Sequence, residues 1–235
     1  MSDRKTVVAV VVAGGMGQRM QASLPKQFML LEGRPVVQWS LECFDATPEI
    51  TGLVLVLPED WIEEGRTRLR GFCPAKQFKV VSGGALRQDS VRSGVGAIES
   101  TDGWVAVHDA ARPGITPSLI SKALNKAFAH GNAVCALPSH DTLVRVVDNE
   151  IVGQLNRDEV YRIQTPQIFK LSVLRQALQN ASEKGLVGTD EASLVRELGY
   201  RINLAEGSEM SAKITTPEDL AMFAALFKKD FVEQK

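Results

Sequence analysis

A buried strand that runs directly into a glycine-rich turn is the feature that most constrains this fold. Residues Val7–Val12 are five valines and one alanine, and Ala13-Gly14-Gly15-Met16-Gly17 follows at once. A continuous apolar run of this kind is typical of a central strand in a parallel sheet covered on both faces. The glycines let backbone N–H groups close around an anion, and Arg19 and Lys26 add positive charge nearby. The segment therefore predicts a strand, a turn and a polyphosphate site.

Two better-known glycine-rich turns do not match this spacing. In the dinucleotide fingerprint G-x-G-x-x-G the third glycine would stand where the chain has Met20, and no strand-ending acid follows about 20 residues on. A P-loop requires Gly-Lys-Ser/Thr after the glycines, and this segment lacks it. The spacing thus argues against a nicotinamide-dependent oxidoreductase and against a P-loop enzyme.

The size and charge of the chain restrict its partners. Its 235 residues are 44% hydrophobic, which suits a single α/β domain over 1–235 without a disulfide or a structural metal. A formal net charge of −1 argues against nucleic acid or an anionic membrane as partner. Three widely spaced cysteines favour a cytoplasmic protein, as does an apolar run that is too short for a membrane span and lacks the small-residue ending of a signal-peptide cleavage site. A small anionic ligand fits these properties best.

Strand and helix patterns alternate along the first 137 residues. This rhythm predicts an α/β fold: a Rossmann-like, mostly parallel, twisted sheet with helices on both faces. Thr116-Pro117 and Thr216-Pro217 are typical of helix starts. Strands are predicted at Thr6–Ala13, Gly52–Leu57, Phe78–Val81, Trp104–His108 and Ala133–Leu137, and helices near Pro35–Phe44, Asp60–Leu69, Asp89–Ile98 and Pro117–Ala129.

The rhythm changes between residues 138 and 160. Thr142–Val147 and Glu150–Leu155 are predicted to be two strands joined at Asp148-Asn149. An isolated hairpin is marginally stable in water, so a protruding β-arm of this kind needs a surface to pack against. We therefore expect a homodimer formed through the arm at 138–160.

Two further turns follow predicted strands and would lie at the same edge of the sheet. Gly83 and Gly84, with Ser90 close behind, could approach a base or sugar, although a flexible turn explains the glycines equally well. Asp109 ends a strand and could bind Mg²⁺ or a sugar hydroxyl. An ion pair between Asp109 and Arg112 that braces the turn is the structural alternative, and both roles can coexist. We expect His108 to pack at the strand end rather than act as a base.

Seven segments spread along the chain match a known family of enzymes. They are Ala13–Met20, Pro25–Phe28, Gly83–Val91, Val107–Pro113, Thr165–Gln167, Thr189–Ala192 and Lys213–Leu220. Taken in order, these segments closely resemble the 2-C-methyl-D-erythritol 4-phosphate cytidylyltransferases. The resemblance covers nearly the whole sequence, and His108 through Pro113 is its most specific part, because related sugar nucleotidyltransferases share the glycine turn but not this segment.

The resemblance implies an enzyme of non-mevalonate isoprenoid synthesis that joins CTP to 2-C-methyl-D-erythritol 4-phosphate and releases pyrophosphate, with Mg²⁺ bound. Arg19 and Lys26 would stabilise the transition state at the α-phosphorus, while Arg157 and Lys213 would position the methylerythritol phosphate. The family is a homodimer, so the arm would bring Thr142 and Arg157 to the neighbour's site. The implied substrate-binding residues are Ala13, Gly14, Gly15, Gly17, Gly83, Ser90, Asp109, Ala110, Arg112, Thr142, Thr165 and Thr189, with Asp109 also the candidate metal ligand.

Two other functions stay open on the sequence. A ribitol-5-phosphate cytidylyltransferase would share the fold and the first glycine turn, although Ala110-Ala111 and the lack of an aromatic residue after Pro113 favour the methylerythritol enzymes. A nucleotide-sensing module could keep the fold without catalysis, but the presence of all four expected cations favours an enzyme.

Overall fold

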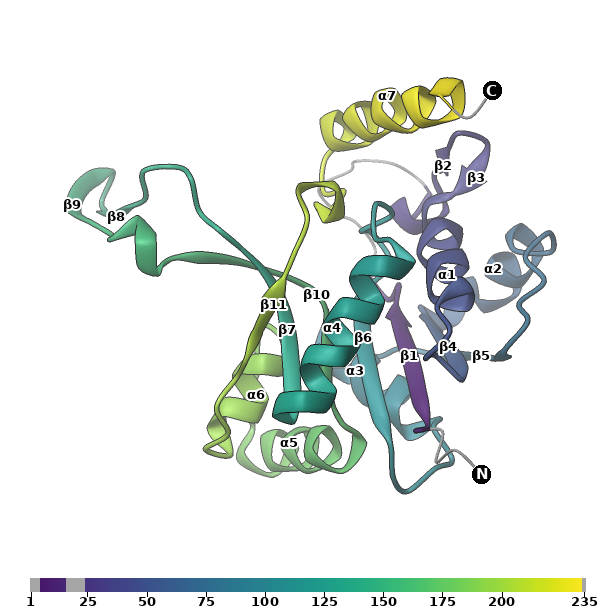
Figure 1. Ribbon diagram of the computed structural model, residues 1–235, viewed down its shortest axis with the longest axis horizontal. Helices are drawn as coiled ribbons and strands as arrows, with labels where there is room; N and C mark the ends of the chain where they lie inside the picture. Colours follow the sequence, from purple (N-terminus) through teal and green to yellow (C-terminus); the bar gives the residue numbers. More distant parts are fainter. Residues whose placement is uncertain (1–4, 16–23, 234–235) are drawn as a thin grey trace.

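The computed structural model describes residues 5–15 and 24–233, and a seven-stranded sheet forms its centre (Figure 1). Every neighbouring pair of strands is parallel except those that involve β10, which runs antiparallel to both β6 and β7. In spatial order the strands are β11 (Leu204–Glu206), β7 (Asn132–Pro138), β10 (Tyr161–Lys170), β6 (Trp104–Asp109), β1 (Val7–Val12), β4 (Gly52–Leu57) and β5 (Gln77–Ser82). The predicted mostly parallel α/β sheet is confirmed.

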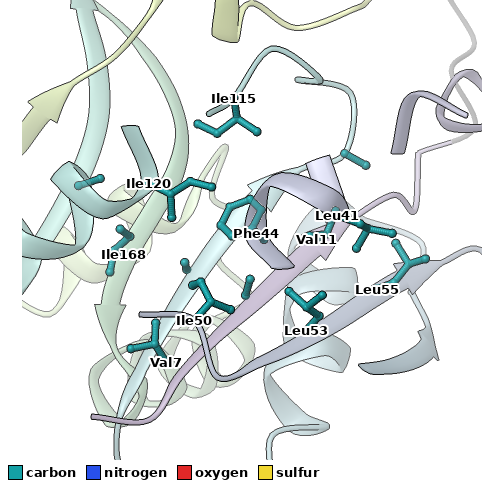
Figure 2. Close-up of a cluster of buried hydrophobic side chains, with 14 of the residues drawn as sticks. Val7, Val11, Leu41, Phe44, Ile50, Leu53, Leu55, Ile115, Ile120 and Ile168 are labelled. Atoms are coloured by element: carbon teal, nitrogen blue, oxygen red, sulfur yellow. The ribbon is translucent and has the colours of Figure 1, made fainter. Parts of the chain in front are cut away.

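Helices cover both faces of this sheet, and β1 shows why. Val7, Ala9 and Val11 point into the core on one face, whereas Val10 and Val12 point into a second core on the other. Figure 2 shows the first of these cores, where Phe44 and Leu41 pack over the strands. The first face carries α1 (Val36–Ala46), α2 (Ile62–Arg68) and α4 (Pro117–His130), and the second carries α3 (Arg87–Gly96), α5 (Leu171–Lys184) and α6 (Glu191–Glu197).

The last helix, α7 (Pro217–Glu233), packs apart from the sheet. Its Phe223 and Phe227 share a third core with Leu31 and Ile214, so the helix lies beside the small β2–β3 hairpin (Leu30–Leu31 and Arg34–Pro35; Figure 1). The described residues also form short 3-10 helices: η2 (Lys26–Phe28), η3 (Glu59–Trp61), η4 (Arg157–Glu159) and η5 (Glu209–Ser211). No helix in the described part of the chain is both long and apolar enough to span a membrane.

The two strands predicted between residues 138 and 160 pair as an antiparallel hairpin of β8 (Val144–Val147) and β9 (Glu150–Gln154). Asp148 and Asn149 both have positive φ, as the tight hairpin turn requires. The hairpin projects from the central sheet (Figure 1), and its Ile151 and Val152 side chains are 71% and 58% exposed. These apolar side chains have no cover within the described chain.

The helix starts at Thr116 and Thr216 are also confirmed, because each hydroxyl accepts a backbone N–H three residues on. The predicted strand Trp104–His108 extends by one residue to Asp109, and Phe78–Val81 is longer at both ends. The patterns in the sequence did not predict the antiparallel strand β10.

Candidate active site

A cavity of about 450 Å³ opens at the carboxyl ends of β1 and β6, where the turns after these strands meet the turn after β5. Lysine side chains approach it from two directions, Lys26 from η2 and Lys213 from the segment before α7. The lining residues are Val12, Ala13, Gly14, Gly15, Lys26, Gln27, Gly84, Ala85, Leu86, Arg87, Ser90, Asp109, Ala110, Ala111, Lys213 and Thr215. We call this cavity the edge pocket.

Ser90 lies between the two glycine turns of the edge pocket. It is 1% exposed, and its hydroxyl accepts the Gly84 N–H and donates to the Leu86 carbonyl, both at 3.3 Å. A Cβ atom on Gly14 or Gly83 would come within 2.5 and 2.6 Å of the Ser90 Oγ. A side chain at either glycine would therefore force Ser90 or the turn to shift.

Lys26 is tied to the segment that carries Lys213. Its Nζ donates to the Ile214 carbonyl at 2.9 Å, and the neighbouring Gln27 amide donates to the Ala13 carbonyl at 2.6 Å. These two bonds link the turn after β1 to the segment that precedes α7. As a result, both lysines sit on one connected rim of the edge pocket.

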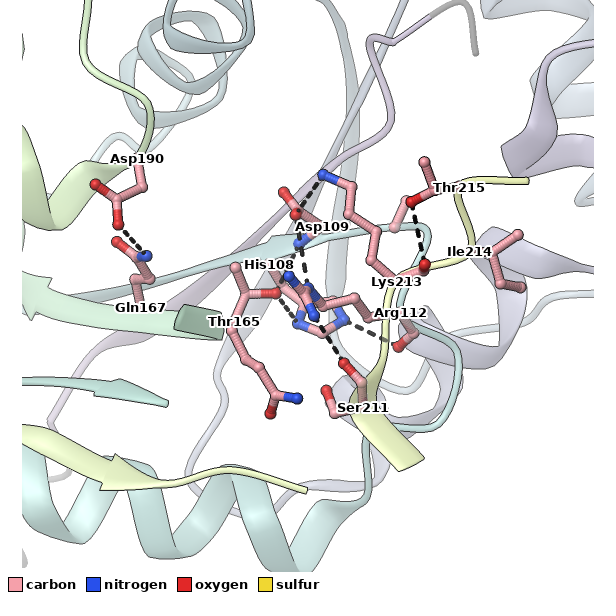
Figure 3. A network of polar contacts seen from close by, with 12 residues as sticks. His108, Asp109, Arg112, Thr165, Gln167, Asp190, Ser211, Lys213, Ile214 and Thr215 are labelled. Atoms are coloured by element: carbon pink, nitrogen blue, oxygen red, sulfur yellow. Dashed lines mark hydrogen bonds and ion pairs between the residues drawn. The ribbon is translucent and has the colours of Figure 1, made fainter. Parts of the chain in front are cut away.

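Asp109 is the centre of a cluster of charges at the end of β6 (Figure 3). Its Oδ2 accepts from Lys213 Nζ at 2.8 Å, its Oδ1 accepts from Arg87 Nε at 3.0 Å, and Arg112 Nε lies 3.6 Å from Oδ2. Burial alone would raise the pKa of Asp109, but the charges of Arg87 and Lys213 hold it well below its usual range. Asp109 is therefore ionised, and the predicted Asp109–Arg112 ion pair is present.

Arg87 also binds a second carboxylate. Its Nη1 and Nη2 donate to the two oxygens of Glu191 at 2.6 and 3.1 Å, so the guanidinium joins Glu191 to Asp109. Glu191 is 2% exposed at the start of α6. Sequence reasoning gave neither residue a role, because 104 positions separate the pair and no spacing pattern connects them.

His108 and Thr165 support Asp109 from inside the sheet. The Thr165 hydroxyl accepts the Asp109 backbone N–H at 3.1 Å and lies 2.9 Å from His108 Nδ1, while His108 Nε2 lies 3.3 Å from the Arg112 carbonyl oxygen. Burial lowers the pKa of His108 to about 3, so the ring is neutral at pH 7. His108 is completely buried, as expected for a packed strand end.

The structure separates the predicted site residues into groups. Eight of them line the edge pocket: Ala13, Gly14, Gly15, Lys26, Ser90, Asp109, Ala110 and Lys213. Three others support the pocket from behind it: Gly83, Arg112 and Thr165. Thr142 and Arg157 belong to the projecting segment around the hairpin, and Thr189 is exposed just before α6. Gly17 and Arg19 lie outside the described residues.

The edge pocket contains one carboxylate, that of Asp109, and both of its oxygens already accept from Arg87 and Lys213. Asp109 is the only acid among the lining residues, and the described residues contain no group of three or more His, Cys, Asp or Glu side chains placed to hold a metal. Mg²⁺ commonly uses one or two carboxylates together with substrate phosphates and water. The residues therefore fit a metal that is bound largely by a nucleotide's phosphates.

Comparison with known proteins points to one family. Residues 7–229 match the profile described as IspD, 2-C-methyl-D-erythritol 4-phosphate cytidylyltransferase. A protein of that name from Dehalococcoides mccartyi is 38% identical over 224 residues, which cover 95% of this chain and 96% of the relative.

Solved structures give the same result. The chain is similar to a 2-C-methyl-D-erythritol 4-phosphate cytidylyltransferase from Thermus thermophilus, with a TM-score of 0.77 and 31% identity, covering 95% of this chain and 99% of the other. It is also similar to a 4-diphosphocytidyl-2C-methyl-D-erythritol synthase from Anaerococcus prevotii, with a TM-score of 0.85 and 26% identity, covering 96% and 97% of the two chains.

Proposed function

Because the chain belongs to the IspD family of 2-C-methyl-D-erythritol 4-phosphate cytidylyltransferases, we propose that it transfers the cytidylyl group of CTP to 2-C-methyl-D-erythritol 4-phosphate. The products are 4-diphosphocytidyl-2-C-methyl-D-erythritol and pyrophosphate. The observation that carries this proposal is the edge pocket, in which Lys26 and Lys213 approach from two segments and two glycine turns meet at Ser90. A cationic pocket of this form suits two phosphate-bearing substrates.

The glycine turns suit the nucleotide. The turn at Gly14 and Gly15 follows β1 and would bind the triphosphate through its backbone N–H groups. The turn at Gly83 and Gly84 would contact the ribose and base. An ordinary side chain at Gly14 or Gly83 would press on Ser90 and narrow this space.

The lysines suit the transfer step. An oxygen of the methylerythritol phosphate attacks the α-phosphorus in line, the bond from that phosphorus to the bridging oxygen breaks, and pyrophosphate leaves with the electron pair. Lys26, with Arg19, stabilises the charge on the reacting phosphate, and Lys213 positions the attacking phosphate. Both nucleophile and electrophile are anionic, so these fixed charges lower the repulsion between them.

We include Mg²⁺ in this proposal as a partner of the triphosphate. When bound, it neutralises phosphate charge and improves pyrophosphate as a leaving group. Asp109 is the lining residue that could hold it, although both oxygens of Asp109 already accept from Arg87 and Lys213. Loss of activity on chelation with EDTA, restored by added Mg²⁺, would support this part of the proposal.

We further propose a homodimer in which the 138–160 arm of one nucleotidyltransferase domain (1–235) reaches the edge pocket of its partner. The exposed apolar side chains of β8 and β9 supply a surface for that contact. Thr142 and Arg157 lie on the arm, and Arg157 is exposed in the single chain. With the arm in that position, both residues would lie against the methylerythritol phosphate bound in the partner's pocket. We also propose a cytoplasmic location, because all three cysteines are free thiols, as is usual in a reducing compartment.

A substrate panel tests the function directly. Pyrophosphate release is measured with CTP and Mg²⁺ plus methylerythritol phosphate, ribitol 5-phosphate or no acceptor. We expect release with methylerythritol phosphate alone. Release with ribitol 5-phosphate instead would assign the other cytidylyltransferase activity, and CTP binding by calorimetry without any turnover would assign a nucleotide-sensing role.

A further inference from the structure

Glu191 is a buried carboxylate that touches the edge pocket only through another side chain. It is 2% exposed, it does not line the pocket, and both of its oxygens accept from Arg87. Burial raises the pKa of Glu191, and the Arg87 charge opposes that rise. A buried acid held this way has its charge matched by one partner, the Arg87 guanidinium.

Arg87 itself lines the edge pocket, so its orientation matters to any bound phosphate. Its Nη1 and Nη2 face Glu191, which leaves Nε to donate to Asp109 Oδ1 at 3.0 Å. Arginine binds phosphate groups through paired N–H donors as readily as it binds carboxylates. Glu191 therefore occupies the pair of donors with which Arg87 could otherwise bind a nucleotide phosphate.

The contacts continue from Arg87 to Lys213 on the rim of the edge pocket. Asp109 accepts from Arg87 on Oδ1 and from Lys213 on Oδ2, so fixing the first oxygen fixes the direction of the second. The series Glu191, Arg87, Asp109, Lys213 alternates in sign and runs from the start of α6 to the pocket. The series thus connects the buried carboxylate of Glu191 to Lys213 on the rim of the edge pocket.

From this arrangement we infer that Glu191 is a positioning residue for the transfer reaction. It holds Arg87 on Asp109 and away from the nucleotide phosphates, so that Asp109 keeps Lys213 in place for the acceptor phosphate. The inference rests on the proposed function, because it assigns Lys213 to the acceptor. It predicts that loss of the Glu191 charge impairs use of the acceptor more than use of CTP.

The test compares Glu191→Gln with Glu197→Gln, which removes the same charge from an exposed position on the same helix. Steady-state rates of pyrophosphate release give kcat and KM for each substrate. For Glu191→Gln we expect kcat/KM for methylerythritol phosphate to fall about tenfold or more, with KM for CTP unchanged or lower, since small displacements of a positioning group are costly. Glu191→Asp should recover part of the loss, and Glu197→Gln should match the wild type.

A double-mutant cycle with Arg87→Met tests whether Glu191 acts through Arg87, and the comparison of acceptor with CTP separates positioning from a merely structural ion pair. If Glu191 acts through Arg87, adding Glu191→Gln to Arg87→Met should change kcat/KM for the acceptor by less than about twofold. A loss as large as in the wild-type background, or equal losses for CTP and acceptor, would overturn the inference. If Glu191→Gln fails to fold, Glu191→Asp carries the test, because its shorter side chain shifts the carboxylate that holds Arg87, and equal losses for CTP and acceptor in that variant would overturn the inference. An inactive wild type would instead count against the proposed function.

Discussion

The Nζ atom of Lys213 lies 2.8 Å from Oδ2 of Asp109, although 104 positions separate the two residues in the sequence. The contact joins the end of β6 to the segment that precedes α7, and it places the lysine on the rim of the edge pocket. Lys213 keeps part of its side chain accessible while Asp109 is nearly covered. An arriving phosphate can therefore share the lysine, whereas the aspartate stays as its fixed counter-charge.

Replacing Asp109 with Asn should lower both the stability and the activity of the protein. The variant leaves Arg87, Arg112 and Lys213 without their shared anion, and removal of one partner from a buried ionic cluster costs about 3 kcal/mol or more. Urea unfolding at pH 7 measures this loss, with the exposed Asp60→Asn as the matched control. Equal stability of the two variants would show that the cluster contributes nothing net.

Lys26→Ala should reduce turnover far more than nucleotide affinity. A cation that acts on the transition state contributes about 3 kcal/mol, which corresponds to roughly a hundredfold in kcat. Pyrophosphate release gives kcat, and calorimetry with CTP gives affinity. The exposed Lys122→Ala serves as the control. Equal losses in turnover and affinity would make Lys26 a simple binding residue.

Gly83→Ala should damage the nucleotide turn. Its new methyl group would lie 2.6 Å from Ser90 Oγ and 3.3 Å from a Val56 methyl carbon, and overpacking of this kind costs about 1–3 kcal/mol. We expect a lower melting temperature and weaker CTP binding. Gly96→Ala is the matched control, because a Cβ there meets nothing within 4 Å. A Gly83→Ala protein that binds CTP normally would mean that the turn relaxes without cost.

Mixing two inactive variants tests whether the pocket is shared between subunits. In a heterodimer of Lys26→Ala and Arg157→Ala, one pocket has an intact lysine and receives an intact arm, while the other has neither. Random exchange of subunits in a closed dimer should therefore restore about one quarter of wild-type activity. No recovery, after mass spectrometry has verified subunit exchange, would place Arg157 outside the partner's site.

The parts of this protein that sequence reasoning predicted are those defined by adjacent residues. The Val7–Val12 strand with its glycine turn, and Asp109 at the end of β6, follow from local patterns, and the structure brings them to one edge of the sheet. The antiparallel strand β10 was missed, because its direction depends on where the chain re-enters the sheet after the hairpin.

Side-chain partners across the fold were equally hidden from the sequence. Arg87 and Glu191 meet only because α3 and α6 pack on the same face of the sheet. Thr165, which the family resemblance assigns to substrate binding, is buried, and its hydroxyl accepts the Asp109 N–H. Neither contact produces a periodic pattern in the sequence, because each forms only when distant segments pack together on the sheet.

The buried ring of His108 should make the protein less stable as the pH falls below neutral. Burial lowers its folded-state pKa from 6.5 to about 3, so between these values the unfolded chain binds a proton that the folded chain does not. Stability is therefore lost as the pH drops through 6.5, and the loss between pH 7 and pH 5 is about 2 kcal/mol.

Urea unfolding at both pH values, on wild type and His108→Asn, measures this effect. Glu191, whose pKa burial raises, acts in the opposite direction in both proteins, so the difference between their pH slopes isolates the histidine. The slope should flatten in His108→Asn and stay unchanged in His140→Asn, which removes an exposed histidine. Because slopes are compared, a uniform loss of stability in His108→Asn does not affect the result. Identical slopes in all three proteins would mean that the ring takes up a proton in the folded state.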